Sequence, residues 1–143
     1  MPGKDPTHWL HRLTADEWLA AAETELGHCH DALSRRAVRP GVTHARRAAG
    51  MAWNALIAAA PDAAAADLLV ARFGRSYMEH VVALAGDENV ESELRSAAQV
   101  LRDTPPAPTE LVTLGKPDLR ALDAARTIVG GVRRALTSGR TDT

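Results

Sequence analysis

An arginine-rich stretch at residues 35–47, RRAVRPGVTHARR, holds the densest group of side chains that could bind an anion. The group consists of Arg35, Arg36, Arg39, His44, Arg46 and Arg47. Guanidinium groups form paired hydrogen bonds with phosphate oxygens, and the amides that begin a helix add positive potential. We therefore predict a phosphate-binding site here, for a nucleotide or for RNA. The alternative is a solvated basic loop that is balanced by acidic residues such as Asp16, Glu17 and Glu23.

The histidines and the single cysteine do not form a recognisable metal site in the sequence. His28, Cys29 and His30 are consecutive, and successive residues of a helix diverge by about 100°, so these side chains cannot close on one ion. His8 and His11 are three residues apart, but they provide only two ligands. We predict no metal and no cofactor, and we expect Cys29 to pack as a small apolar residue.

Several classes of protein are excluded by motif and composition. The chain has no P-loop, no dinucleotide-binding fingerprint and no serine or cysteine in the context of a nucleophile. A formal net charge of −1 gives no reason to expect tight, unassisted nucleic-acid binding, and an aromatic content of 3% leaves few platforms on which bases could stack. We expect no readout of a DNA sequence. The longest apolar run, residues 55–73, is interrupted by Pro61, Asp62 and Asp67, so we expect no membrane span. Without a secretory signal and with one cysteine, the expected location is cytoplasmic.

Helical spacing of apolar residues predicts the scaffold that positions these groups. Five helices are predicted, over residues 14–36, 43–60, 62–85, 88–102 and 117–136, with a kink at Gly74 in the third. Thr14 and Glu17 have the spacing of a capping box for the first helix, and Thr43 and Asp62 are the expected caps of the second and third. No segment shows the alternation of a strand, so the fold class is all-α. With 143 residues the chain makes one domain, residues 14–137, between a tail or short helix at 1–13 and a flexible tail at 138–143.

Two of these helices contain unusually small residues. The second presents a stripe of alanines, and because small side chains allow close approach of another backbone, we place it at the centre of a bundle. In the last helix Gly130-Gly131 costs about 1 kcal/mol per glycine against alanine, which predicts close packing or a bend there.

The order of these segments resembles the HEPN family, small helical bundles named for nucleotide binding in higher eukaryotes and prokaryotes. Members have a tryptophan-containing first helix similar to EWLAAAETEL at 17–26 and an alanine-rich second helix similar to HARRAAGMAWNALI at 44–57. Their last helix follows a proline-containing irregular segment and is similar to DLRALDAARTIVGGVRRAL at 118–136. The resemblance covers about residues 14–136. It implies a five-helix up-and-down bundle that forms a homodimer.

Members of this family that cleave RNA carry an arginine, a polar residue and a histidine, and RSYMEH at 75–80 resembles that motif. The resemblance implies catalytic roles for Arg75, Ser76 and His80 in a metal-independent reaction. Histidine would exchange protons with the 2′-hydroxyl or the leaving oxygen, and arginine would stabilise charge on the phosphoryl group.

The geometry of a helix limits that interpretation. On an ideal helix Arg75 and His80 point about 140° apart, so they converge only on a distorted helix or across two subunits. Ser76 and His80 would share a face, joined by Arg72 if Gly74 does not break the helix. The alternative is a surface arginine with a solvated or capping histidine.

Three functions follow from these features. We favour a HEPN-like accessory module that dimerises through its alanine-rich helices, binds a nucleotide or an RNA phosphate and acts with a partner protein. The family resemblance implies a nucleotidyltransferase-like protein or an antitoxin as that partner. The second hypothesis is a metal-independent endoribonuclease toxin, and the third is a scaffold bundle without a ligand.

Overall fold

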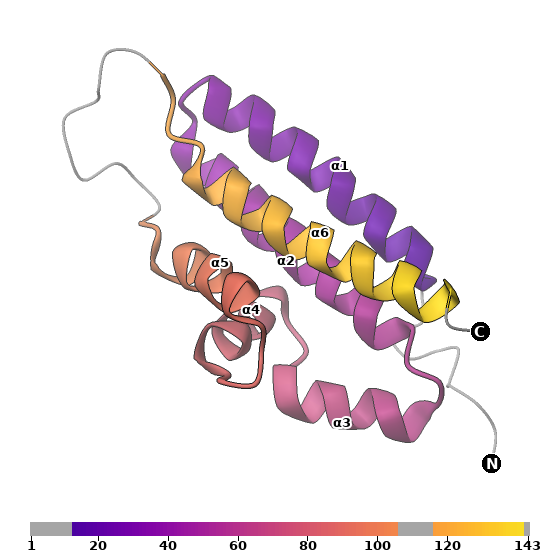
Figure 1. Cartoon of the computed structure of the whole chain (residues 1–143). Coiled ribbons are helices and arrows are strands. Elements are labelled where there is room, and N and C mark those ends of the chain that lie inside the picture. The colour runs from indigo at the N-terminus through magenta and orange to yellow at the C-terminus, as the bar shows by residue number, and fades with distance from the viewer. Residues whose placement is uncertain (1–12, 106–115, 142–143) are drawn as a thin grey trace.

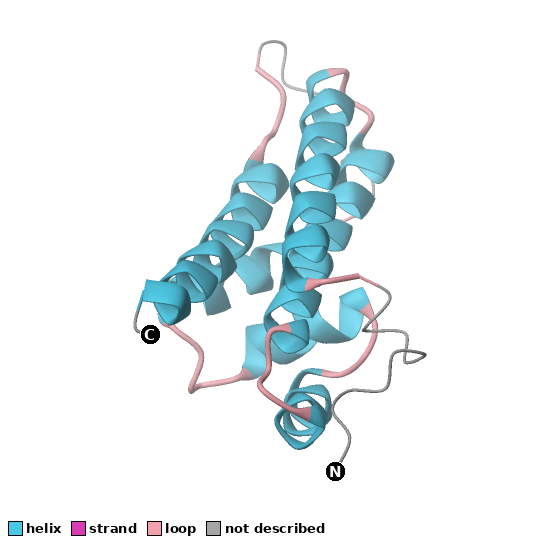
Figure 2. Ribbon diagram, turned by 90° about the vertical axis from the view of Figure 1, so that its right-hand side faces the viewer, coloured by secondary structure: helices cyan, strands magenta, loops and turns pink. Residues whose placement is uncertain are grey.

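The structure is a computed structural model that describes residues 13–105 and 116–141, and its secondary structure in these ranges is entirely helical (Figures 1 and 2). Six helices lie in the described ranges: α1 (Ala15–Ser34), α2 (Val38–Ala58), α3 (Ala63–Phe73), α4 (Tyr77–Gly86), α5 (Ser92–Asp103) and α6 (Arg120–Thr141). The predicted all-α fold class is confirmed. Our predictions for residues 1–12, including His8 and His11, lie outside the described residues.

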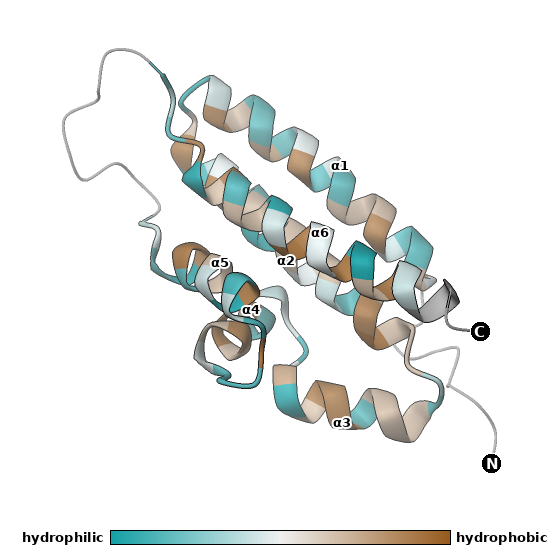
Figure 3. Cartoon of the chain, in the orientation of Figure 1, coloured by the Kyte–Doolittle hydropathy of each residue, from teal (hydrophilic) through white to brown (hydrophobic). Residues whose placement is uncertain are grey.

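Three long helices form the body of the bundle. In Figure 1, α2 runs back against α1, and α6 lies beside both and runs in the same direction as α2. The shorter helices α4 and α5 pack against each other, and both contact α2. Hydrophilic and hydrophobic residues alternate along the long helices in Figure 3, as expected for amphipathic helices around a common core. No described helix combines the length and the hydrophobicity needed to cross a bilayer.

Helix α2 occupies the centre, as its small residues predict, and it contacts each of the other five described helices. Its alanines at positions 45, 48, 49, 52 and 55 are all 0% exposed. At Gly50 the start of α4 comes so close that an added Cβ would lie 2.6 Å from Cα of Tyr77. These small residues allow the backbones to approach, and they leave no exposed alanine stripe on α2.

The start of α2 differs from the prediction. We predicted a helix capped by Thr43, but α2 begins at Val38. Pro40 is its third residue, where the amide needs no partner within the helix, so proline is tolerated there. Gly41 is buried against α1, since an added Cβ would lie 2.3 Å from Cδ2 of Leu33. Arg36, with φ of 64°, reverses the chain just before α2.

The third predicted helix is two helices, which is why residues 13–105 and 116–141 contain six helices rather than the five predicted. Gly74 has φ of 79° and ends α3, as residues in the left-handed region commonly do. Ser76 then caps α4 through a capping box with Glu79, in which each side chain accepts a hydrogen bond from the other residue's backbone amide. The predicted cap Asp62 does begin α3, where its Oδ1 accepts from the amide of Ala65.

The last two helices also have shifted ends. Helix α5 begins at Ser92 rather than near Glu88, because the preceding residues form a turn in which Asp87 accepts from the amide of Asn89. Helix α6 begins at Arg120 and continues to Thr141, so the predicted flexible tail at 138–143 is helical through residue 141.

Candidate functional site

His80 lies in the core of the bundle and is 0% exposed. Its Nδ1 is 2.8 Å from the carbonyl oxygen of Phe73, and its Nε2 is 2.8 Å from the side-chain amide of Asn54. Both ring nitrogens therefore have partners inside the protein. The ring joins the end of α3 to the C-terminal part of α2, a position that suits a structural histidine.

The hydrogen bonds define the protonation state of this ring. Burial lowers the pKa of His80, so the ring is neutral at pH 7 and carries one N–H. Nδ1 donates that hydrogen to Phe73, whose carbonyl can only accept, and Nε2 is then an acceptor. The structure places Oδ1 of Asn54 against Nε2 and leaves its buried Nδ2 without a hydrogen-bond partner. A 180° turn of the amide would direct Nδ2 toward this acceptor and give the nitrogen a partner.

The structure does not gather the predicted catalytic residues around one cleft. Ser76 is the N-cap of α4, so it does not share a helical face with His80, and the alignment with Arg72 is also wrong. Arg72 instead pairs with Asp87 at 2.6 Å. Arg75 is exposed in the connection between α3 and α4. This placement favours the non-catalytic alternative, with the difference that the histidine is buried rather than solvated.

The residues of the predicted phosphate site do not form one group in the structure. Arg46 has a structural role. Its Nε donates to the carbonyl oxygen of Leu101 at 2.8 Å, and a terminal nitrogen donates to that of Thr104 at 2.9 Å. These carbonyls lie at the end of α5, where they have no partners within the helix. Arg46 therefore fastens α5 to α2.

His44 and Arg47 contact a carboxylate that the sequence did not single out. Glu25, on α1, is 7% exposed, and its Oε2 lies 2.5 Å from Nδ1 of His44 and 3.8 Å from Nδ1 of His28. Its Oε1 accepts from Nε of Arg47 at 2.9 Å. Burial raises the pKa of Glu25, but the hydrogen bonds of His44 and Arg47 outweigh it and leave the pKa below its usual value.

This Glu25 cluster, comprising Glu25, His28, His44 and Arg47, joins α1 to α2. The two imidazole centroids are 5.2 Å apart, and the Arg47 guanidinium lies 6.0 Å from the Tyr77 ring. The local signal in the sequence is a glutamate three residues before a histidine, which places both on one face of α1. His44 joins them only through the packing of α2 on α1, which the sequence pattern did not reveal.

Three predicted residues remain at the surface, around the α1–α2 connection. Arg35, Arg36 and Arg39 are all exposed, and within the described residues Arg35 and Arg39 have no ion-pair partner. Helix α2 adds an open end: its N-cap Ala37 makes no side-chain hydrogen bond, and its first turn contains no acidic residue. We call Arg35, Arg36, Arg39 and this helix start the basic turn.

Of the acidic residues near the basic turn, only Asp31 lies within one helical turn of Arg35, and it also pairs with His30 at 3.6 Å. Glu17 is in the first turn of α1, which at 1.5 Å per residue is about 27 Å from Arg35 along the helix. Glu23 pairs with Arg133 of α6. Both glutamates are farther from Arg35 than the roughly 10 Å over which salt screens exposed charges. With three arginines against the single nearby carboxylate of Asp31, the basic turn carries a net positive charge.

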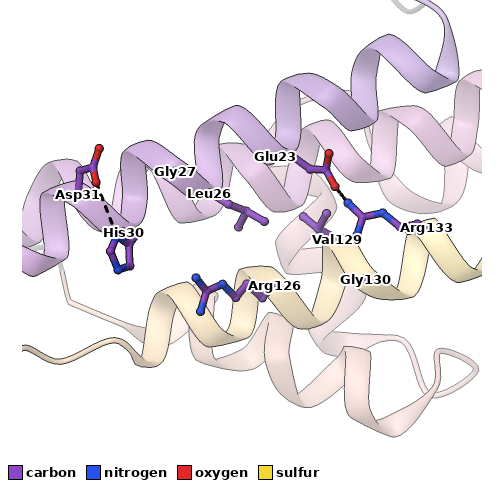
Figure 4. A pocket seen from close by; sticks show the side chains of 9 residues that line it. All are labelled: Glu23, Leu26, Gly27, His30, Asp31, Arg126, Val129, Gly130 and Arg133. Atoms are coloured by element: carbon purple, nitrogen blue, oxygen red, sulfur yellow. Dashed lines mark ion pairs between the residues drawn. The ribbon is translucent and has the colours of Figure 1, made fainter.

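A groove of about 640 Å³ lies between α1 and α6 (Figure 4). His30 and Asp31 form an ion pair at 3.6 Å on one side, and Glu23 and Arg133 pair across it. Cys29, near by on α1, is buried as predicted, and burial raises the pKa of its thiol to about 11. Such a thiol is not a nucleophile at neutral pH. The polar groups of this groove largely neutralise one another.

No protein-family model, curated protein or solved structure matches the chain. The basic turn and the Glu25 cluster are therefore the features of the structure that point to a function.

Proposed function

We propose that this protein is a non-catalytic helical module that binds the phosphate of a nucleotide or of RNA at the basic turn. The observation that carries the proposal is the set of three exposed arginines around an uncapped helix start. At this end Val38 and Arg39 carry amide hydrogens that need no partner within the helix, whereas Pro40 has none, and an anion held there would accept from them. Arg35, Arg36 and Arg39 supply the charge and the paired donors that a phosphate group accepts.

The chemistry of the turn favours recognition of phosphate rather than of bases. Within the described residues, Trp18 and Trp53 are buried, so neither offers a platform on which a base could stack. The resemblance to HEPN proteins points to the same ligand class. The non-catalytic part of the proposal is supported by His80, whose two ring nitrogens are occupied inside the core.

A homodimer and a partner protein remain part of the proposal. The alanines of α2 are buried in the core, so a dimer would have to use another surface. Large apolar side chains are exposed on the shorter helices, where Leu68 of α3 is 73% exposed and Val82 of α4 is 50% exposed. Figure 3 shows α3 as largely hydrophobic on its drawn face. We propose this surface for the second copy or for a nucleotidyltransferase-like protein or antitoxin, with light scattering as the test of a dimer.

The proposal is tested with a triple variant and a matched control. Arg35→Ala, Arg36→Ala and Arg39→Ala together should abolish the thermal stabilisation that millimolar ATP gives the wild type. A ligand stabilises a fold only by binding the folded state, by about 2.7 kcal/mol at 100 times its Kd. Arg102→Ala, Arg133→Ala and Arg134→Ala remove the same charge from other exposed positions and should preserve the effect.

Three results would contradict this function. If the control triple loses the stabilisation as fully as the basic-turn triple, the effect is one of net charge and not of a site. If the wild type cleaves labelled RNA in EDTA, the protein is the metal-independent ribonuclease of the alternative hypothesis. No stabilisation by ATP together with no RNA retention at low salt would leave the scaffold hypothesis.

A further inference from the structure

We propose that Glu25, His28 and His44 form a binding site for one divalent transition-metal ion of the zinc type. One carboxylate oxygen and two imidazole nitrogens from α1 and α2 lie within 4.8 Å of one another. His28 and His44 are not paired with any other carboxylate within the described residues. The inference is independent of the basic turn, because it rests on different side chains.

The distances are close to those of a metal centre. Bonds of about 2.0–2.1 Å in a tetrahedral zinc site place neighbouring donor atoms roughly 3.3 Å apart. Oε2 of Glu25 lies 3.8 Å from Nδ1 of His28 and 2.5 Å from Nδ1 of His44. Rotations of His28 and His44 about their side-chain bonds, with shifts of less than about 1 Å, bring both pairs to the required spacing. Because both imidazoles retain some exposure, the rotations do not disturb the core.

Arg47 holds the ligand Glu25 in position by a hydrogen bond. Its Nε donates to Oε1 of Glu25 at 2.9 Å, which fixes the carboxylate and leaves Oε2 to face the two imidazoles. Ligating carboxylates are commonly held in this way by an outer hydrogen bond. A glutamate carboxylate is ionised at neutral pH, as a metal ligand must be.

The set of donors selects the class of metal. Two imidazoles and one carboxylate suit Zn²⁺ and its first-row neighbours better than Mg²⁺ or Ca²⁺, which prefer oxygen ligands. Three protein ligands leave a fourth position of the ion open. His28 has 55% of its side chain exposed, so this position lies near solvent and can hold water or an anion.

The test is a titration of tag-free, full-length protein with Zn²⁺ by calorimetry, repeated with Co²⁺ by visible absorption. We expect one ion per chain for the wild type, and Co²⁺ bands of a site with nitrogen and oxygen ligands. His28→Ala removes one ligand from the surface without touching the core, and it should weaken binding at least about 100-fold. His44→Ala should do the same.

The matched control is His30→Ala, because His30 is also exposed on α1 but lies outside the cluster. It should bind Zn²⁺ as tightly as the wild type. A second control replaces His8 and His11 together and should also leave binding unchanged. The proposal is overturned if the wild type binds no ion, if binding survives both His28→Ala and His44→Ala, or if either control variant loses it.

Discussion

Replacing His80 with leucine tests whether this residue is part of the core. Leucine has a volume similar to that of imidazole, but it deletes the titrating group and both hydrogen bonds. The Phe73 carbonyl and the Asn54 amide then lose their partner, at about 1–3 kcal/mol each, which the burial of leucine partly offsets. We expect a net loss of about 2 kcal/mol in the free energy of unfolding at pH 8.

The difference in the free energy of unfolding between the wild type and His80→Leu should decrease in acid. Burial lowers the pKa of folded His80, whereas in the unfolded chain it stays near 6.5. Below pH 6.5 the unfolded chain therefore binds a proton that the folded chain rejects, so the wild type loses stability as the pH falls. The loss reaches at most about 1.4 kcal/mol per pH unit, and it ends at the folded pKa. His80→Leu lacks this contribution, so the gap of about 2 kcal/mol at pH 8 should be smaller at pH 5.5, by at most about 1.4 kcal/mol.

The assay is urea unfolding followed by circular dichroism at pH 8.0, 6.5 and 5.5. The other histidines and carboxyl groups are common to both proteins, so their titration cancels in the difference. A gap that is constant with pH, or that widens in acid, would refute a buried neutral His80. Because His80→Leu weakens the fold, a loss of activity in it would not identify a catalytic histidine. Arg75→Ala, at an exposed position, is the variant that tests catalysis.

Three other features of the packing predict the effects of substitutions on stability and the reactivity of Cys29. Gly50→Ala should destabilise the fold by more than about 2 kcal/mol in thermal unfolding, because its Cβ would meet the backbone of α4. Gly27 has open space around it, so Gly27→Ala should stabilise the fold by about 0.5–1 kcal/mol. Equal effects of the two substitutions would contradict this packing. Arg46→Ala should cost about 2 kcal/mol in urea unfolding, because two helix-end carbonyls lose a charged donor, and exposed Arg102→Ala should cost less than about 1 kcal/mol. Cys29 should react with iodoacetamide at pH 8 only after unfolding, and rapid labelling of the native protein would contradict its burial.

Local capping and spacing predicted much of the fold. The capping box of Thr14 and Glu17, the cap at Asp62 and the buried alanines of α2 were predicted correctly, because each depends on near neighbours or on simple periodicity. The start of α2 was predicted wrongly, because Pro40 is also typical of a break and only the packing of Gly41 on α1 shows that the helix continues.

The candidate sites were less predictable, since they depend on contacts between helices. The sequence identified the arginines of residues 35–47, but not that Arg46 reaches α5 while Arg47 reaches Glu25. The serine and glutamate of RSYMEH also have the spacing of a capping box, which places Ser76 outside α4 and divides the predicted motif. Nothing local could show that His80 meets Asn54, 26 positions away.

The central claim is phosphate binding at the basic turn, and the salt dependence of RNA binding tests it most directly. Fluorescence anisotropy with a labelled single-stranded RNA should show binding at about 50 mM salt, with log K falling against log salt with a slope near −2 for three phosphate contacts. The variant lacking Arg35, Arg36 and Arg39 should show neither the binding nor the slope. Equal affinity and slope in that variant, or no binding by the wild type, would contradict the claim.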